Sequence, residues 1–293
     1  MYTRDLFSAK RVVFSLEVFP PKKDTSVNVI YNTLLGLRGL PADFISVTYG
    51  AGGSIAQREK TCEIASLIRS TYHIEPVSHL TCVNSTREEV AQALDKLKET
   101  QICNILALRG DRTPGVEPKT DFPHASDLAR FIREYDPFFN VLGACYPECH
   151  FESDSLEEDI EHLKIKIDSG VTHLITQLFF DNGCFYRFLE KARAMGVDVP
   201  IEAGIMPIVS KNQIERTVTM CGASVPHKLA TIFSRYADNP AALRDAGIFY
   251  ATEQIMDLLE NGVQGIHLYT MNNVDTATRI SRSIENIIAA KNA

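Results

Sequence analysis

The chain has 293 residues, a formal charge of −7 and 45% hydrophobic residues, which is typical of a globular protein rather than a disordered or fibrous one. The acidic balance argues against a nucleic-acid binder, because neutralising phosphates requires clustered Lys and Arg. No apolar run approaches the roughly 20 residues of a membrane span, the N-terminus does not read as a signal peptide, and the Cys residues are scattered, so we expect a cytoplasmic protein.

Short apolar runs rich in β-branched residues recur along the whole chain. Because these runs are nearly continuous rather than alternating, each predicts a strand that is buried on both faces. The predicted strands cover residues 12–17, 44–48, 76–80, 104–108, 141–145, 173–177, 201–205 and 265–268.

Amphipathic segments with helical spacing separate these strands. Residues 86–100 begin at a plausible N-cap, Ser85 or Thr86, and residues 155–169 end at Gly170, a typical helix stop. The strand ends recur about 30 residues apart, which predicts a (β/α)8 TIM barrel forming one domain over residues 1–293. Helical patterns near 211–220, 226–236 and 241–261 predict extra helices before the last strand. An open doubly wound sheet is the alternative, but the first strand lacks the glycine-rich turn of that fold.

Polar residues stand at the C-terminal ends of seven of the eight predicted strands, where barrel enzymes place their active sites. Together they predict a large polar-lined pocket. The residues are Glu17, Thr48, Tyr49, His79, Thr81, Arg109, Gly110, Asp111, Tyr146, Glu148, His150, Gln177, Tyr269, Thr270 and Asn272.

Glu17 lies in an apolar setting, between Leu16 and Val18. Desolvation raises the pKa of a carboxyl group, so Glu17 could keep its proton near neutral pH and act as a general acid. The alternative is a partly exposed carboxylate that forms a salt bridge at the rim of the barrel.

Two further motifs follow predicted strands. Residues 50–54 form a glycine-rich turn that could present backbone N–H groups to an anion, or that simply needs glycines for a tight turn. Arg109 and Asp111 flank Gly110, and their charges could contact a cofactor or form an internal ion pair.

In the helix predicted over 155–169, Asp159, His162, Leu163 and Lys166 fall on one face. Lys166 could reach a phosphate from there, although a solvated face is the more common explanation of such charges.

Cys145, Cys149 and His150 form the tightest group of potential metal ligands. A metal site needs three or four converging ligands, so we favour small buried thiols beside a functional His and expect no metal.

Several motifs, taken in order, resemble the methylenetetrahydrofolate reductase family nearly from end to end. The resemblance implies the short microbial form of that family, with the catalytic barrel only. It implies FAD at the strand ends and reduction of 5,10-methylenetetrahydrofolate to 5-methyltetrahydrofolate, a step of one-carbon metabolism and methionine biosynthesis. The motifs are FSLEVFPPK at 14–22, FISVTYGAGGS at 44–54, SHLTC at 78–82, ILALRGD at 105–111, HASDL at 124–128, ACYPECH at 144–150, ITQLFFD at 175–181, GIMPI at 204–208 and HLYTMN at 267–272.

The same resemblance implies roles for individual residues. Glu17 would be the general acid that opens the imidazolidine ring of the substrate, Asp111 would tune both flavin and pterin, and Gln177 would hydrogen-bond the pterin. The positions that match FAD contacts in the family are Thr48, His79, Arg109, Gly110, Asp111, Ala125, Tyr146, His150, Asp159 and Lys166.

The chain departs from the family pattern in three places. Thr217 stands where some bacterial members have an aromatic that stacks on substrates, and Asn273 stands where some carry an Arg for the folate glutamate tail. His162 and Ile165 replace Asn and Arg on the helix that faces FAD, so the phosphate contacts are expected to differ.

Two other functions remain open alternatives. One is a cofactor-free barrel lyase with Glu17 and His79 as acid and base, although the predicted strands contain no Lys for a Schiff base. The other is a non-catalytic subunit that docks with an electron-transfer partner. For the reductase, the donor could be NADH, NADPH or a reduced partner protein, and the chain could form a homo-oligomer or join a partner subunit.

Overall fold

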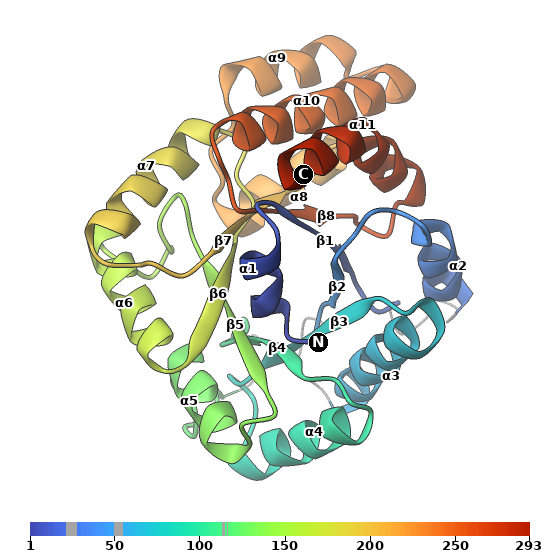
Figure 1. Cartoon of the computed structure of the whole chain (residues 1–293). Helices are drawn as coiled ribbons and strands as arrows, with labels where there is room; N and C mark the ends of the chain where they lie inside the picture. The colour runs from blue at the N-terminus through green and yellow to red at the C-terminus, as the bar shows by residue number, and fades with distance from the viewer. Residues whose placement is uncertain (22–27, 50–54, 113–114, 116) are drawn as a thin grey trace.

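Eight parallel strands form a closed barrel in chain order, with helices around it (Figure 1). The computed structural model describes residues 1–21, 28–49, 55–112, 115 and 117–293. The barrel closes where β1 pairs with β8, from Val13 opposite Gly265 to Glu17 opposite Tyr269. The predicted (β/α)8 fold is therefore confirmed. The strands are β1 (Val13–Val18), β2 (Phe44–Val47), β3 (Glu75–Thr81), β4 (Asn104–Leu108), β5 (Asn140–Cys145), β6 (Val171–Thr176), β7 (Ile201–Ile205) and β8 (Gly265–Tyr269).

Helices follow the strands and pack on the outside of the barrel. Thr86 caps α4, because its hydroxyl accepts from the Glu89 N–H and the Glu89 carboxylate accepts from the Thr86 N–H. Ser155 caps α6 in the same position, and Gly170, at φ +107°, follows its end. The ring helices are α2 (Asn28–Leu37), α3 (Ile55–Tyr72), α4 (Arg87–Glu99), α5 (Ala125–Tyr135), α6 (Leu156–Asp168), α7 (Asn182–Ala194) and α11 (Val274–Asn292).

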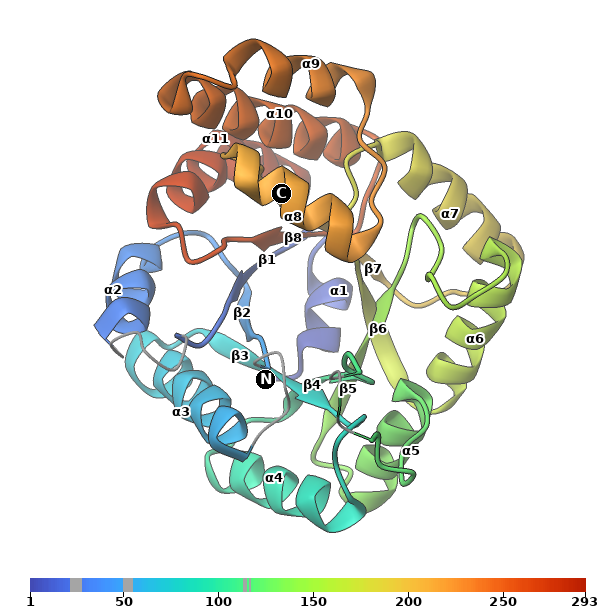
Figure 2. The same cartoon turned by 180° about the vertical axis from the view of Figure 1, so that it is seen from behind.

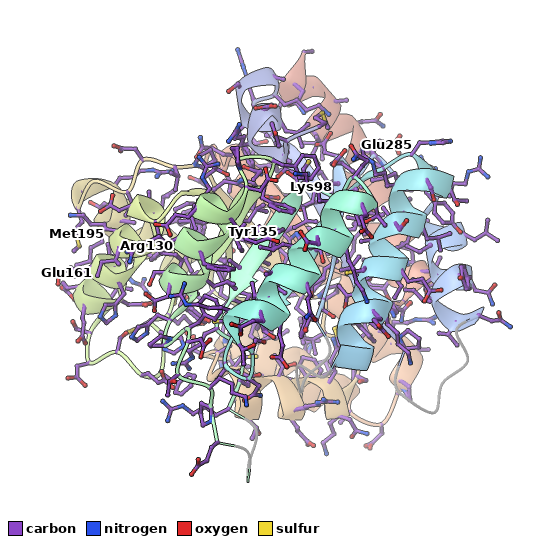
Figure 3. The ribbon with its side chains drawn as sticks, turned by 90° about the horizontal axis from the view of Figure 1, so that it is seen from below. Lys98, Arg130, Tyr135, Glu161, Met195 and Glu285 are labelled. Atoms are coloured by element: carbon purple, nitrogen blue, oxygen red, sulfur yellow. The ribbon has the colours of Figure 1, made fainter. Side chains whose placement is uncertain are left out.

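The outer helices are also linked to one another by polar contacts, and Figure 3 labels three of the side chains involved, Lys98, Arg130 and Tyr135. Tyr135 of α5 donates to Asp95 of α4 over 2.8 Å, and Lys98 of α4 pairs with Asp136 just after α5. Arg130 of α5 donates to Ser169 at the end of α6 over 3.3 Å. These contacts are near the surface, so each stabilises the ring only modestly.

The three extra helices expected before the last strand are present, as α8 (Lys211–Cys221), α9 (His227–Tyr236) and α10 (Pro240–Glu260). They cover a small separate core that includes Leu178, Phe180, Leu229 and Phe233. Figure 2, which looks from behind, shows α8 in front of β8. Across the described ranges, every helix is too short or too polar to span a bilayer.

The N-terminal segment closes one end of the barrel, which the sequence did not lead us to expect. It consists of a short 3-10 helix, Thr3–Asp5, and α1 (Leu6–Ala9), which lies across the barrel opening in Figure 1. Leu6 packs on an apolar layer to which six strands contribute one residue each, namely Val13, Phe44, Val77, Leu106, Leu142 and Ile175. The N-terminal segment therefore covers this end of the barrel, and the polar residues predicted at the strand ends lie toward the other end.

Candidate active site

Glu17 lies near the C-terminal end of β1, and its side chain is only 15% exposed. One carboxylate oxygen, Oε2, is 3.4 Å from His79 Nε2 and 3.5 Å from His267 Nε2. Ser46 of β2 donates to the same oxygen over 3.4 Å. Side chains from β1, β2, β3 and β8 therefore converge on one carboxyl group at the mouth of the barrel.

His79 does not form an ion pair with Glu17 at neutral pH. Burial is the largest influence on its imidazole and lowers its pKa to about 4, although the nearby Glu17 charge opposes this. The imidazole is therefore neutral at pH 7. In the described chain, Glu17 thus faces two imidazoles. The alternative considered for Glu17, a salt bridge at the rim of the barrel, would instead require a Lys or an Arg.

A line of polar side chains continues from Glu17 into the barrel. His267 Nδ1 is 2.7 Å from the Ser15 hydroxyl, and this hydroxyl is 2.7 Å from Glu202 Oε2. Ser15, Glu202 and His267 are completely buried. Burial raises the pKa of Glu202 well above its usual value, which favours the protonated form of this carboxyl group.

Ser15, Glu202 and His267 are members of the site that were not predicted from the sequence. A signal was present, because Ser15 stands two residues before Glu17 and side chains two apart share one face of a strand. His267 stands opposite Ser15 in the register of β1 and β8, which only the closed barrel reveals.

Arg109 follows β4 and is held by Glu152 rather than by Asp111. Two guanidinium nitrogens pair with the Glu152 carboxylate, and the Nη2–Oε1 contact is 2.9 Å. The expected alternative of an ion pair within the Arg-Gly-Asp motif is therefore wrong, and Asp111 is exposed. Gly110 has φ +85°, and a Cβ there would meet the Thr81 side chain at 3.0 Å, so this turn requires glycine.

Tyr146, His150 and Asp159 come together beside β5. Asp159 accepts a hydrogen bond from the His150 N–H over 3.0 Å, and the rings of Tyr146 and His150 lie 4.6 Å apart at 78°. Burial raises the pKa of Tyr146 to about 12, so its hydroxyl keeps its proton and can donate.

Lys166 points inward from α6, and its ammonium donates to the Ala144 carbonyl of β5 over 2.6 Å. The side chain is half-buried rather than fully solvated, and this burial lowers its pKa. The predicted face of α6 is therefore only partly correct: Leu163 is buried and Lys166 is half-buried, but His162 is exposed.

Of the remaining predicted positions, Thr48 and Gln177 lie just beyond strand ends, whereas Ala125 lies at the start of a helix. The Thr48 carbonyl accepts from the Thr61 hydroxyl over 3.1 Å, and Ala125 is the first residue of α5. Gln177 follows β6, and its Oε1 accepts from the Leu178 N–H over 2.9 Å. The glycine-rich turn at 50–54 lies outside the described residues.

The residues that depart from the family pattern are either held by a contact within the chain or exposed. Thr217 is buried on α8, with its hydroxyl 3.7 Å from Met206 Sδ. Asn273 caps α11, because its Oδ1 accepts from the Thr276 N–H over 3.1 Å. Ile165 is 49% exposed, so neither it nor exposed His162 points into the barrel wall.

Within the described ranges, no group of three or more His, Cys, Asp or Glu side chains is arranged to hold a metal ion. Cys145 is buried, and burial raises the pKa of its thiol to about 12. The chemistry available beside β4 and β5 is instead that of an anion site, because Arg109 and Lys166 supply cationic donors of the kind that bind phosphates. The donors fit the diphosphate of a dinucleotide.

Comparison with known proteins identifies the family. The family model described as methylenetetrahydrofolate reductase matches residues 3–285. The chain is 36% identical over 269 residues to methylenetetrahydrofolate reductase 1 of Schizosaccharomyces pombe, covering 90% of this chain and 44% of that protein. It is 32% identical over 270 residues to 5,10-methylenetetrahydrofolate reductase of Escherichia coli, covering 92% and 90%. The chain thus spans about half the length of the yeast and plant relatives it matches.

Solved structures support the fold. An uncharacterized protein from Clostridium thermocellum that binds two copies of 5-methyl-5,6,7,8-tetrahydrofolic acid superposes with a TM-score of 0.68 at 16% identity, covering 98% of this chain and all of that one. A phosphoenolpyruvate phosphomutase from Streptomyces platensis gives a TM-score of 0.53 at 13% identity, covering 99% and 87%. Such low identities establish the barrel alone. Because the family model covers nearly the whole sequence, the chain belongs to the methylenetetrahydrofolate reductase family.

Proposed function

We propose that the chain is an FAD-dependent oxidoreductase that reduces 5,10-methylenetetrahydrofolate to 5-methyltetrahydrofolate. Family membership supports the reaction. The observation that carries the proposal is the carboxyl group of Glu17, which is shielded at the barrel mouth and faces two imidazoles. That position suits an acid that protonates a substrate lying across the strand ends.

In this proposal, residues around β4 and β5 hold FAD. Arg109 and Lys166 supply positive charge for its diphosphate, and Gly110 lets the backbone approach closely because its position has no room for a Cβ. Thr48, His79, Ala125, Tyr146, His150 and Asp159 complete the cofactor site. When bound, FAD supplies the hydride that reduces the one-carbon unit of the folate.

Glu17 provides the proton. Opening the imidazolidine ring breaks a C–N bond, and the departing nitrogen takes the proton from the Glu17 carboxyl group as the bond breaks. The resulting carboxylate accepts a hydrogen bond from Ser46 and lies beside His79 and His267. Gln177 orients the pterin by hydrogen bonding, and Asp111 acts on both flavin and pterin from the loop after β4.

The electron donor is NADH, NADPH or a reduced partner protein. Donor and folate use the same site in turn, so we expect ping-pong kinetics, with all steps carried out by one domain over residues 1–293. Stopped-flow reduction with each donor identifies which of them reacts.

Absorbance of the purified protein tests the proposal against the lyase alternative. We expect flavin bands that bleach under a reductant and return when methylenetetrahydrofolate is added. A colourless protein that cannot be reconstituted with FAD would instead favour the lyase with Glu17 and His79 as acid and base.

A further inference from the structure

Glu202 is an acidic residue placed inside the barrel at considerable cost. It lies in the middle of β7 and is completely buried. Gly265 of β8 makes room for it, since a Cβ at that position would come within 2.6 Å of Glu202 Cγ. A buried carboxyl group is weak support for stability compared with an aliphatic side chain of similar size. The hydrogen bonds of Glu202 therefore point to a role other than stability.

The two oxygens of Glu202 have different surroundings. Oε2 is 2.7 Å from the Ser15 hydroxyl. Oε1 has no hydrogen-bond partner among the described residues and is 3.9 Å from His173 Nε2, which also has none. Burial lowers the pKa of His173 to about 3, so it is neutral and forms no ion pair with Glu202.

The Ser15 hydroxyl has a single proton but two partners at 2.7 Å, Glu202 Oε2 and His267 Nδ1. One of these partners must therefore donate to Ser15. If His267 donated, Ser15 would donate either to Glu202 Oε2, which leaves the acid proton of Glu202 on Oε1 without a partner, or to the Ile266 carbonyl at 3.5 Å, which is too long for a good hydrogen bond. If Glu202 donates from Oε2, that proton is satisfied and Ser15 donates to His267 Nδ1. The second arrangement leaves fewer buried polar groups unpaired.

This arrangement fixes the tautomer of His267. With Nδ1 accepting from Ser15, the ring proton is on Nε2, which is 3.5 Å from Glu17 Oε2. We propose that Glu202 is a positioning residue for the folate reaction: through Ser15 it holds His267 as the Nε2–H tautomer, which supports the carboxylate that Glu17 becomes on giving up its proton. The inference rests on the proposed function only where it concerns the reaction. A third group that fixes the tautomer of a His has the same part in hydrolase triads.

The tautomer can be observed without flavin or folate. Protein labelled with ¹⁵N in its His rings gives separate nitrogen signals for the two tautomers, and the His267 signal is assigned by its loss in His267→Gln. We expect the Nε2–H tautomer in the unaltered chain and a mixture in Glu202→Leu, which has no donor. Glu202→Gln should restore the fixed tautomer, because its amide can donate to Ser15. Leu94→Ala, at a completely buried position of the outer helix α4, is the control for a general core defect and should keep it.

The reaction gives the second readout. We expect Glu202→Leu to slow the folate half-reaction about 10-fold, as expected for impaired proton transfer, and Glu202→Gln to recover most of that loss. Reduction of the flavin by the donor should be nearly unaffected by either change. If Glu202→Leu does not fold, Ser15→Ala breaks the same link and should also give mixed tautomers.

An Nδ1–H tautomer in the unaltered chain, or a tautomer that stays fixed in Glu202→Leu or Ser15→Ala, would overturn the proposal. So would equal slowing by Leu and Gln at position 202, or a changed tautomer with an unchanged folate rate. If the chain reduced no methylenetetrahydrofolate at all, the proposed function would fail, while the nitrogen spectra would still decide the hydrogen-bond arrangement.

Discussion

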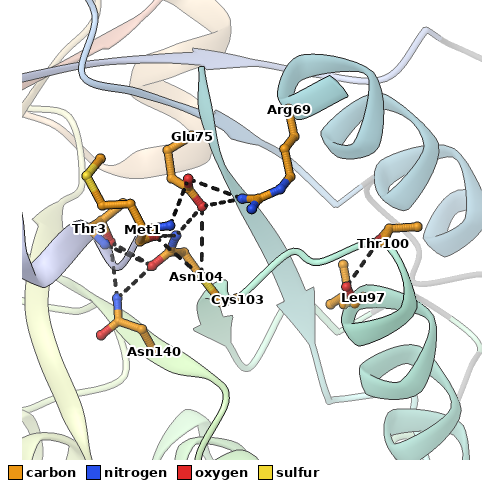
Figure 4. Close-up of polar contacts among 9 residues, drawn as sticks. All are labelled: Met1, Thr3, Arg69, Glu75, Leu97, Thr100, Cys103, Asn104 and Asn140. Carbon is orange, nitrogen blue, oxygen red and sulfur yellow. Dashed lines mark hydrogen bonds and ion pairs between the residues drawn. The ribbon is translucent and has the colours of Figure 1, made fainter. Parts of the chain in front are cut away.

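Asn104 belongs to a network of hydrogen bonds at the closed end of the barrel, below the apolar layer. We expect it to be important for stability but not for turnover. It is completely buried at the start of β4 (Figure 4). Its Oδ1 accepts from the Thr3 N–H over 2.9 Å, from the Thr3 hydroxyl over 3.2 Å and from Asn140 over 3.0 Å. Its Nδ2 donates to the Met1 carbonyl and to Glu75, each over 3.0 Å. Asn104→Ala removes all five hydrogen bonds.

The expected loss follows from these contacts. The three buried bonds to Oδ1 contribute about 1 kcal/mol each, and the orphaned Thr3 N–H adds a desolvation penalty of about 1 kcal/mol. The total is about 4 kcal/mol, which for a chain of this size lowers Tm by about 8 °C. Because the active site lies at the other end of the barrel, kcat at 25 °C should stay within about 2-fold of the unaltered value.

Thermal unfolding followed by circular dichroism, with kinetics on the same samples, provides the assay. The control is Thr100→Ala, since the exposed Thr100 hydroxyl donates only to carbonyls of its own helix, Lys96 and Leu97, each over 3.1 Å. This change should cost less than about 0.5 kcal/mol. If Asn104→Ala were as stable as the control, or if its kcat fell about 10-fold at 25 °C, the reasoning would be refuted.

Three further outcomes are expected. Lys166→Met should weaken FAD binding about 10-fold in fluorescence titrations of the flavin-free protein while changing Tm little, because it keeps the buried stem and removes the charge; unchanged affinity would remove Lys166 from the cofactor site. The folded-state pKa of His173 is about 3, below its unfolded value of about 6.5. Below about pH 6.5 the unfolded chain therefore binds a proton at His173 that the folded chain does not, and the free energy of unfolding present at pH 7 is progressively lost. His173→Phe should therefore lose about 2 kcal/mol less in urea unfolding between pH 7 and pH 5 than the unaltered chain, and an equal loss would contradict this. Asp111→Asn should change the flavin potential and the folate affinity together, and constancy of both would exclude Asp111 from the site.

The barrel was readable from the sequence because each strand is a local apolar run. The predicted strands over 104–108 and 201–205 have the bounds of β4 and β7. β6 begins earlier than predicted, at Val171 directly after Gly170, because Val171 pairs with Val141 of β5, a contact that no local pattern indicates. The segment 3–9 was missed since its fold depends on packing against strands that are distant in sequence.

The sequence predicted a residue of the candidate site only where its position along a strand was enough to place it. Glu17 stands at a strand end, so its place at the mouth followed from the barrel itself. Glu152 was not foreseen as the partner of Arg109, because it comes near only after β4 and β5 pair, whereas Asp111, the ion-pair alternative, is close in sequence. Glu202 could not be recognised, since its hydrogen-bond partner Ser15 is 187 residues away and the run around it looks like an ordinary buried strand.

The two half-reactions of Glu17→Gln test the central claim most directly. Gln keeps the size of the side chain but cannot supply an acidic proton, so the folate half-reaction should slow at least about 10³-fold while flavin reduction by the donor stays within about 3-fold. Glu75→Gln, the same change at the closed end of the barrel, should leave both rates intact. If Glu17→Gln reduced methylenetetrahydrofolate at the rate of the unaltered chain, Glu17 would not be the acid and the proposed mechanism would be contradicted.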